Sequence, residues 1–205
     1  MIGIVAYGSG NIAAIMNILK QRKIPHFVSR DPADLAQADR FILPGVGAFD
    51  PTMETLDRSG LVTFLNEQVL EKGKKALGIC VGMHLLAERS EEGTRPGLGW
   101  IKGHVRKIDV SRINRPPHLP HMGWNSVIPD AGSALFDGVD MARGFYFLHS
   151  YYFDAADPSQ VSARVEYGDA IPCGVERENV YGIQFHPEKS HSNGMRLLRN
   201  FAELA

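Results

Sequence analysis

The chain has 205 residues, of which 44% are hydrophobic, with 22 Lys and Arg against 23 Asp and Glu. This length can bury a substantial core, and we expect residues 1–205 to form a single domain. A net charge of −1 provides no excess of positive charge for nucleic acid or an anionic membrane. Two cysteines exclude a disulfide framework, and no Cys/His cluster has the spacing of a zinc site.

Residues 1–19 carry no charged side chain, a pattern that also occurs in signal peptides. However, no basic segment precedes the apolar run, and the turn residues 8–11 interrupt it. We therefore expect a buried strand over 2–7 and a helix capped by Asn11. No other segment approaches the ~20 apolar residues of a membrane-spanning helix. The sequence predicts a cytoplasmic protein.

Strand and helix patterns alternate through the first half of the chain. Asp31 and Pro32 are typical of the N-cap and first position of a helix, and Gly73 of the residue after one. The short strands are continuously apolar, which is typical of a parallel sheet covered on both faces. Strands are expected over 26–28, 41–43 and 76–79, and helices from 31, over 61–72 and over 81–87.

The second half is punctuated by glycine and proline and shows few helical patterns. Strands are expected over 144–152, which is dense in aromatics, and over 161–166, 173–177 and 180–185, with a last helix over 193–204. Glu178 and Asn179 are expected to turn a hairpin between the last two strands. The predicted fold class is α/β, a largely parallel doubly wound sheet with an antiparallel extension.

A short glycine motif follows the first strand. Gly8, Gly10 and Ala13 open the first helix, and Asp31 lies about 20 residues further on, as in dinucleotide-binding fingerprints. In such motifs the glycines let a pyrophosphate approach the helix N-terminus. A tight turn between strand and helix without a ligand is the more ordinary explanation.

A candidate nucleophile lies in the segment 78–82, Gly-Ile-Cys-Val-Gly, between a buried strand and a helix. This is the thiol counterpart of the G-x-S-x-G nucleophile elbow. The helix N-terminus favours a thiolate at Cys80, and the N–H of Val81 would point to a developing oxyanion. The alternative is a buried structural thiol. Cys173 lies within a strand, has no elbow and is expected to be packing.

A candidate base and its orienting carboxylate close the last strand. His186 and Glu188 are two residues apart, and Pro187 stiffens the backbone between them. A cysteine nucleophile needs a base within hydrogen-bond reach, and the base needs an acceptor for its other nitrogen. Parallel α/β sheets place their sites at the carboxyl ends of strands, where both segments are expected. The combination predicts a Cys80–His186–Glu188 triad.

With these motifs, four further segments make the chain resemble the class I glutamine amidotransferases, specifically the glutaminase subunits of imidazole glycerol phosphate synthases. The segments follow that family's order along the whole chain. They are 43–49 (LPGVGAF), 120–125 (PHMGWN), 146–151 (YFLHSY) and 186–190 (HPEKS). The resemblance implies that family's fold and an enzyme that hydrolyses L-glutamine to glutamate and ammonia through a glutamyl thioester.

The resemblance also implies the remaining site residues. The backbone N–H groups of Val46 and Val81 would form the oxyanion hole, with flanking glycines that let the Val46 segment flip a peptide. Glutamine would be bound at Gly45, Gly47, His84, Glu92, His149, Ser150 and Tyr151. No cofactor and no metal are implied.

The family transfers its ammonia to a (β/α)8-barrel cyclase subunit for imidazole ring closure in histidine biosynthesis. A heterodimer is therefore expected, with no nucleic-acid or membrane partner. Trp124 and Asn125 are candidates for the interface with the barrel, although plain core packing explains them equally well. We also expect the isolated subunit to be poorly active until the partner completes the oxyanion hole at Val46.

The chain departs from this family at several positions, which leaves more than one function open. The family usually has Gln at the position of His84, and an imidazole differs from an amide in reach and charge. Segments 97–101 and 189–195 look closer to paralogues that supply ammonia for amidation of a surface-polysaccharide sugar. The sequence is also compatible with an inactive regulatory or scaffolding relative, or with a thiol hydrolase or peptidase of related architecture.

Overall fold

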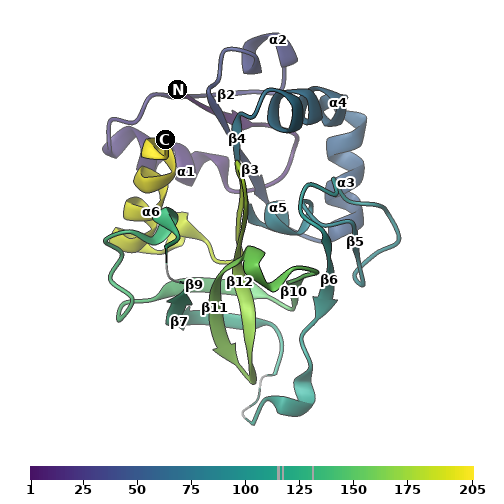
Figure 1. Ribbon diagram of the computed structural model, residues 1–205, viewed down its shortest axis with the longest axis vertical. Helices are drawn as coiled ribbons and strands as arrows, with labels where there is room; N and C mark the ends of the chain where they lie inside the picture. Colours follow the sequence, from purple (N-terminus) through teal and green to yellow (C-terminus); the bar gives the residue numbers. More distant parts are fainter. Residues whose placement is uncertain (115, 117, 131) are drawn as a thin grey trace.

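A large sheet forms the centre of the computed structural model, which describes residues 1–114, 116, 118–130 and 132–205 (Figure 1). Its strands, in spatial order, are β2 (His26–Ser29), β1 (Ile2–Val5), β3 (Arg40–Gly45), β4 (Lys75–Cys80), β13 (Val180–Ile183), β12 (Asp169–Arg177), β11 (Val161–Tyr167) and β8 (Val127–Pro129). The strands from β2 to β13 pair in parallel, and those from β13 to β8 pair antiparallel. The predicted parallel sheet with an antiparallel extension is confirmed.

Helices cover both faces of this sheet (Figure 1). On one side lie α1 (Ile12–Gln21) and α6 (His191–Glu203), and on the other lie α3 (Phe49–Arg58), α4 (Leu61–Asn66) and α5 (Val81–His84). The short helix α2 (Pro32–Leu35) is capped by Asp31, whose carboxylate accepts the N–H of Ala33 as the sequence predicts. The arrangement is doubly wound, because crossover helices shield both apolar faces.

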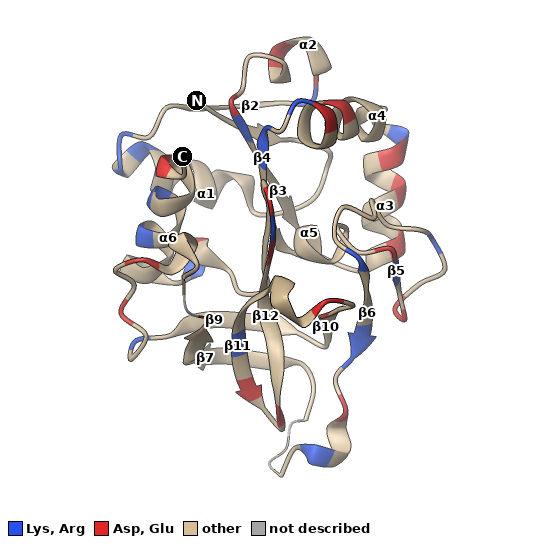
Figure 2. Cartoon of the chain, in the orientation of Figure 1, with Lys and Arg blue, Asp and Glu red and all other residues tan. Residues whose placement is uncertain are grey.

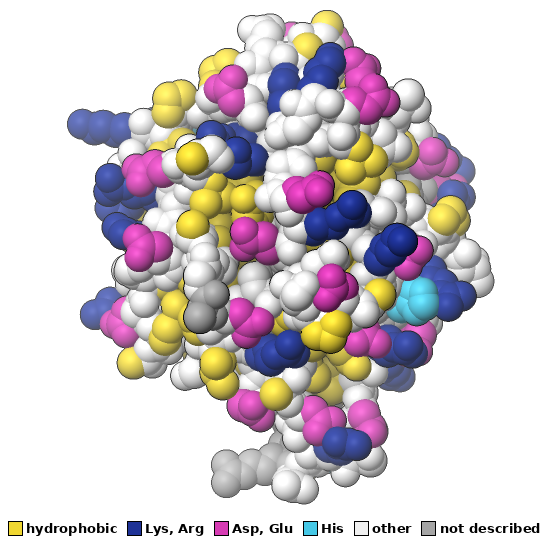
Figure 3. Space-filling model, in the orientation of Figure 1, with side chains coloured by type: hydrophobic (Ala, Val, Ile, Leu, Met, Phe, Trp, Pro, Cys, Tyr) yellow, Lys and Arg dark blue, Asp and Glu magenta, His cyan; other side chains and the backbone are white. Residues whose placement is uncertain are grey.

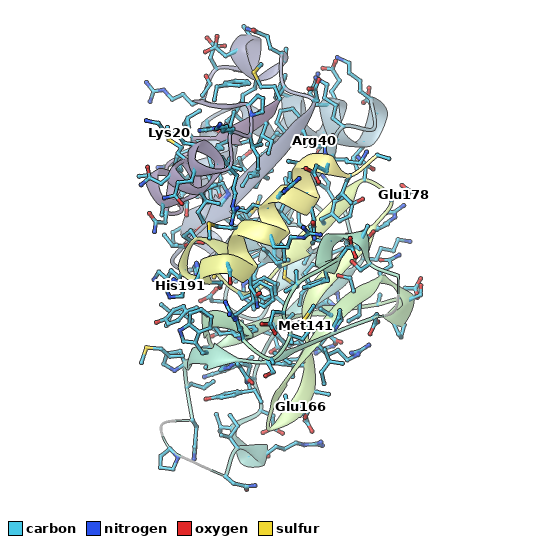
Figure 4. The ribbon with its side chains drawn as sticks, turned by 90° about the vertical axis from the view of Figure 1, so that its left-hand side faces the viewer. Lys20, Arg40, Met141, Glu166, Glu178 and His191 are labelled. Carbon is cyan, nitrogen blue, oxygen red and sulfur yellow. The ribbon has the colours of Figure 1, made fainter. Side chains whose placement is uncertain are left out.

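The last helix is fastened to the sheet at its C-terminal end. Arg40, on β3, donates from its guanidinium to the carbonyl oxygens of Phe201 and Leu204 at 2.6 and 3.2 Å. These carbonyls belong to the helix end that carries partial negative charge, so a cation there is stabilising. Figure 4 shows α6 crossing the molecule, with Arg40 near one end and His191 at the other.

Two small sheets lie beside the antiparallel end of the large one (Figure 1). One contains β5 (Arg89–Ser90), β6 (Gly103–Lys107) and β10 (Tyr151–Ala155), and the other contains β7 (His121–Asn125) and β9 (Phe145–His149). The prediction of one strand over 144–152 is therefore wrong. At Ser150 the chain leaves β7, the partner of β9, and pairs with β6 through β10. A run of aromatic residues indicates extended backbone but does not indicate where a strand passes from one sheet to another.

Three helical segments also differ from their predictions. Helix α3 was not expected, although Phe49, Met53 and Leu56 share one buried face at helical spacing. The helix expected over 61–72 is divided into α4 and a π-helical turn, η1 (Glu67–Glu71). The helix expected over 81–87 ends at His84. The hairpin across Glu178 and Asn179 is confirmed by the pairing of Arg177 with Val180.

Charged side chains are distributed over the surface without a patch of one sign on the face in Figure 3. By contrast, Figure 2 shows β7 and β9 free of Lys, Arg, Asp and Glu.

None of the helices in the described part of the chain is long and apolar enough to cross a bilayer.

Candidate active site

The predicted nucleophile elbow is present at the carboxyl end of β4. Cys80 has φ 56° and ψ −113°, a strained backbone conformation for a residue with a side chain. The flanking glycines have a steric reason. A Cβ on Gly78 would lie 2.4 Å from the carbonyl oxygen of Gly82, and one on Gly82 would lie 1.9 Å from that of Leu43. Only glycines let the elbow lie this close to its own helix and to β3.

His186, the predicted base, follows β13 and is held by hydrogen bonds to β9 and to Ser190. The backbone N–H of His186 donates to the carbonyl of Tyr146 at 2.9 Å, and the N–H of Tyr146 donates to the hydroxyl of Ser190 at 3.0 Å. That hydroxyl donates in turn to the carbonyl of His186 at 2.6 Å. These bonds hold both the backbone N–H and the backbone carbonyl of His186, which fixes the position from which its side chain projects.

The triad side chains are buried together. Nδ1 of His186 donates to Oε1 of Glu188 at 2.9 Å, and the two side chains are only 5% and 2% exposed. Burial disfavours the imidazolium, but hydrogen bonding and charge from Cys80 and Glu188 outweigh it and raise the pKa of His186 to about 10. At neutral pH the site therefore favours an imidazolium at His186, beside Cys80 and the Glu188 carboxylate.

A pocket of about 350 Å³ opens over the cysteine. All but one of the residues expected at the site line it; Gly45 instead packs beneath the elbow, where a Cβ would lie 2.4 Å from the nitrogen of Gly82. The residues found together are Val46, Gly47, Cys80, Val81, His84, Glu92, His149, Ser150, Tyr151, His186 and Glu188. The sequence did not indicate four others, Asn11, Pro120, Leu148 and Lys189. A larger hollow beside α6 contains no His or Cys and is not a candidate for thiol chemistry.

One predicted oxyanion donor is occupied in this conformation. The N–H of Val46 donates to the hydroxyl of Ser9 at 2.9 Å, and that hydroxyl donates to the carbonyl of Val46 at 3.0 Å. The Val46 peptide is thus held by a reciprocal pair of bonds from a loop after β1. Next to it, Gly47 has φ 100° and open space around its Cα, so this peptide has room to reorient.

The family described as "Glutamine amidotransferase class-I" matches residues 7–204. The chain belongs to the class-I glutamine amidotransferases. It is 48% identical over 204 residues to "Imidazole glycerol phosphate synthase subunit HisH" of Bdellovibrio bacteriovorus, with 100% of both chains covered. It is 46% identical to "Imidazole glycerol phosphate synthase subunit HisH 2" of Pseudomonas aeruginosa, again over 100% of both.

Solved structures agree on the fold of this amidotransferase. A crystal structure of a glutamine amidotransferase superimposes with a TM-score of 0.73 at 21% identity, covering 98% of this chain and 97% of that one. The structure of PurLQS from Thermotoga maritima superimposes with a TM-score of 0.69 at 19% identity, covering 98% and 96%. The resemblance inferred from the motifs, the class I fold and the assignment as an enzyme are confirmed.

The dinucleotide motif of this amidotransferase has a packing explanation. A Cβ on Gly10 would lie 2.4 Å from Cβ of Pro44, so the glycine is needed where the turn meets the end of β3. Asn11 precedes α1 but its side chain forms no cap bond, and it lines the pocket instead. The described residues contain no group of three or more His, Cys, Asp or Glu placed to hold a metal ion.

Behind the pocket, a chain of hydrogen bonds runs through two buried histidines. The Tyr151 carbonyl can only accept, so Nδ1 of His149 donates to it, at 2.8 Å. Nε2 of His149 then accepts from Nδ1 of His121 at 2.9 Å, and Nε2 of His121 accepts from the amide of Asn125 at 3.2 Å. Asn125 thus turns inward, and the structure does not place its side chain on the exposed face expected for an interface residue.

Three histidines around the pocket are neutral, in contrast to His186. Burial lowers the pKa of His84 and of His121 to about 4 and that of His149 to about 3. The His121 ring is also stacked between those of Phe147 and Tyr167, at 4.6 and 4.0 Å between centroids. Of these four histidines, only His186, beside Cys80, is therefore charged at neutral pH.

These opposite shifts predict a stability maximum near pH 6.5. The three neutral histidines have folded pKa values below 6.5, so their contribution is full above that pH and is lost as pH falls toward 4. The raised pKa of His186 contributes stability that is full below 6.5 and lost as pH rises through about 10. We expect the free energy of unfolding in urea to decline on both sides of the maximum.

A matched variant isolates one of these contributions. His84→Gln removes a buried titrating group, so its loss of stability between pH 6.5 and 4.5 should be smaller than that of the wild type, with the alkaline side unchanged. Identical acid-side profiles for the two proteins would contradict the neutral state assigned to His84.

Proposed function

We propose that this protein is the glutaminase subunit of an imidazole glycerol phosphate synthase, and that Cys80, His186 and Glu188 are its catalytic triad. The observation that carries the proposal is the strained elbow cysteine beside a buried imidazole–carboxylate pair, in a pocket large enough for an amino acid. The full-length relatives named for that synthase support the same activity.

The geometry supports a thioester mechanism. The Cys80 thiolate attacks the side-chain amide carbon of glutamine, and the imidazolium of His186 gives its proton to the nitrogen as the C–N bond breaks. Ammonia leaves and a glutamyl thioester remains. Neutral His186 then takes a proton from a water molecule as the water oxygen attacks the thioester carbon. The C–S bond breaks, glutamate leaves and the Cys80 thiolate is regenerated. Glu188 stabilises the imidazolium in both halves.

Glu92 is suited to the amino group of the substrate. It lines the pocket, and its Oε2 accepts the backbone N–H of Phe49 at 2.9 Å, which fixes the carboxyl group in place. Burial raises the pKa of Glu92, and a bound ammonium would favour its ionised form. We propose that this carboxylate binds the α-ammonium of glutamine, with Gly47, His84, His149, Ser150 and Tyr151 forming the remaining walls.

The sharpest test of the triad uses the two cysteines. Cys80→Ala removes the nucleophile, and we expect glutamate release in the presence of the barrel partner to fall at least ~1000-fold. Cys173→Ala is the matched control, because that thiol is fully buried in β12 and burial raises its pKa. An inactive regulatory relative would show no difference between Cys80→Ala and wild type, and that result would overturn the proposal.

We propose that the barrel partner docks on the uncharged ribbon of β7 and β9, which we call the docking face. Three large apolar side chains are exposed there: Met122 by 63%, Trp124 by 48% and Leu148 by 38%. Trp124 lies flat against His191, at 5.3 Å between ring centroids, which presents a rigid aromatic surface. Leu148 also lines the pocket, so the docking face adjoins the position where ammonia would form.

Truncation of the aromatic anchor should weaken the complex. We expect Trp124→Ala to raise the dissociation constant for the barrel partner by about 30-fold, the usual range for an interface hot spot. Leu70→Ala is the control, because Leu70 is equally exposed but precedes β4, at the opposite end of the parallel strands. Equal affinities for the two variants in calorimetry would exclude the docking face as the interface.

We further propose that Ser9 keeps the isolated subunit poorly active, because its hydroxyl occupies the N–H of Val46 that the oxyanion needs. Ser9→Ala removes both bonds to that peptide. Glutaminase activity without partner should therefore rise by about tenfold, the equivalent of roughly 1.4 kcal/mol of hydrogen bonding. Partner-bound activity should change little. If the isolated variant is no more active than wild type, the Ser9 bonds do not limit the oxyanion hole.

A second candidate differs only in the ammonia acceptor. His84 and the segments 97–101 and 189–195 favour a paralogue that serves amidation of a surface-polysaccharide sugar. Reconstitution with a cyclase barrel and its substrate decides between them, since only the first candidate forms imidazole glycerol phosphate in step with glutamate. A cytoplasmic location and a single domain over residues 1–205 also stay predictions.

A further inference from the structure

Two buried polar side chains behind the nucleophile have no part in the mechanism above. His84 is the last residue of α5, and Gln184 follows β13, two residues before the catalytic base. Both are almost completely inaccessible to solvent. They meet at 2.7 Å, between Nε2 of His84 and Oε1 of Gln184. The other end of the Gln184 amide, Nε2, lies 3.9 Å from the Cys80 sulfur.

The protonation of His84 fixes the direction of this contact. A carbonyl oxygen only accepts, so Nε2 of His84 carries the hydrogen and donates it to Gln184. The low pKa of His84, about 4, leaves the ring neutral, and Nδ1 is then an acceptor without a hydrogen. The amide of Gln184 is thereby turned with its N–H₂ group toward the sulfur. The reverse orientation would direct an oxygen at a thiolate.

We propose that Gln184 is a positioning residue that holds the Cys80 thiolate through its side-chain N–H, and that His84 fixes the orientation of that amide. This inference rests on the proposed thiolate chemistry of Cys80. A hydrogen bond from a neutral donor stabilises an anion without competing for its proton. The sulfur is thus stabilised on one side by the imidazolium of His186 and on the other by an amide.

The proposal also defines what His84 offers to substrate. Nδ1 of His84 is buried and has no hydrogen-bond partner among the described residues, although the side chain lines the pocket. Since Nε2 is engaged by Gln184, the ring can only accept there. His84 is therefore suited to an N–H of the substrate and not to a carbonyl oxygen, whereas a Gln at this position could offer either group.

Other titratable groups surround the sulfur and must be constant in any test. Tyr7 follows β1, and its pKa is raised mainly by burial and to a lesser extent by the charge of Cys80. His149 lies at the end of β9, and His186 and Glu188 follow β13. Glu92 and Lys189 carry the remaining charges of the pocket lining. The substitutions below leave all of these in place.

The test measures the reactivity of the Cys80 thiolate and does not depend on glutamine. In a Cys173→Ala background, the rate of alkylation by iodoacetamide is followed against pH, which titrates the one remaining thiol. We expect Gln184→Leu to shift the midpoint of the profile upward by about one pH unit, as for loss of one hydrogen bond to an anion. Gln68→Leu, a buried glutamine in η1, is the matched control and should leave the midpoint unchanged.

Two substitutions of His84 test the orienting step. His84→Phe keeps the ring but removes the donor, so the amide of Gln184 is free to turn and the midpoint should rise. His84→Gln restores a donor to Oε1 of Gln184 and should return the midpoint to within about 0.3 pH units of wild type. A purely structural role for His84 predicts no such rescue.

The outcomes separate this inference from the proposed function. An unchanged profile in a folded Gln184→Leu protein would overturn the inference while leaving glutamine hydrolysis by Cys80 untouched. Should that variant fail to fold, Gln184→Glu is the same size and replaces the N–H₂ with a carboxylate oxygen, so an equal or larger upward shift is expected. With glutamine as substrate, kcat should fall more than KM rises in Gln184→Leu, because the contact is to the nucleophile.

Discussion

The site depends on one close approach of backbone to backbone. The elbow after β4 lies against the end of β3, with the Cα of Gly82 so near the carbonyl of Leu43 that no side chain fits between them. Next to this contact Cys80 has a positive φ, a strained conformation for a residue with a side chain, and it lines the pocket. Gly45 lies opposite Cys80 in the parallel register, and it too has no room for a side chain, because the backbone of Gly82 packs against it. The Val46 peptide follows directly, so its position depends on the same close contact. Cys80 and the Val46 peptide are therefore placed by a single packing requirement.

The histidines around this elbow differ in charge at neutral pH, because their surroundings shift their pKa values in opposite directions. His84, His121 and His149 are surrounded by neutral donors, acceptors and aromatic rings, so burial keeps them uncharged. Only at His186 do Cys80 and Glu188, through hydrogen bonding and charge, outweigh the cost of desolvation and raise the pKa. Of the four histidines in and behind the pocket, only His186 therefore carries a positive charge at neutral pH.

The sequence predicted the features that depend on local steric rules. An elbow needs small residues at fixed positions, a hairpin needs a turn, and a cysteine at a strand end needs a base, so the segment 78–82 and the pair His186–Glu188 were recognisable. The inward direction of Asn125, the bonds of Ser9 to Val46 and the orientation of Gln184 were not. Each depends on which distant strand or loop lies opposite, and hydrophobic periodicity does not contain that information.

The two strands β7 and β9 have one face exposed to solvent and the other face toward the pocket. Successive side chains point to opposite faces, so Met122 and Trp124 are exposed while His121 and Asn125 face inward. His121 pairs with His149 across the ribbon, both by register and through its ring. Trp124 therefore lies on the outer face of a strand whose inner face carries the hydrogen-bond chain that ends at the Tyr151 carbonyl. Because the Tyr151 carbonyl can only accept, it sets the tautomers of His149 and then of His121, so this buried chain of hydrogen bonds runs in one direction from Asn125 to Tyr151.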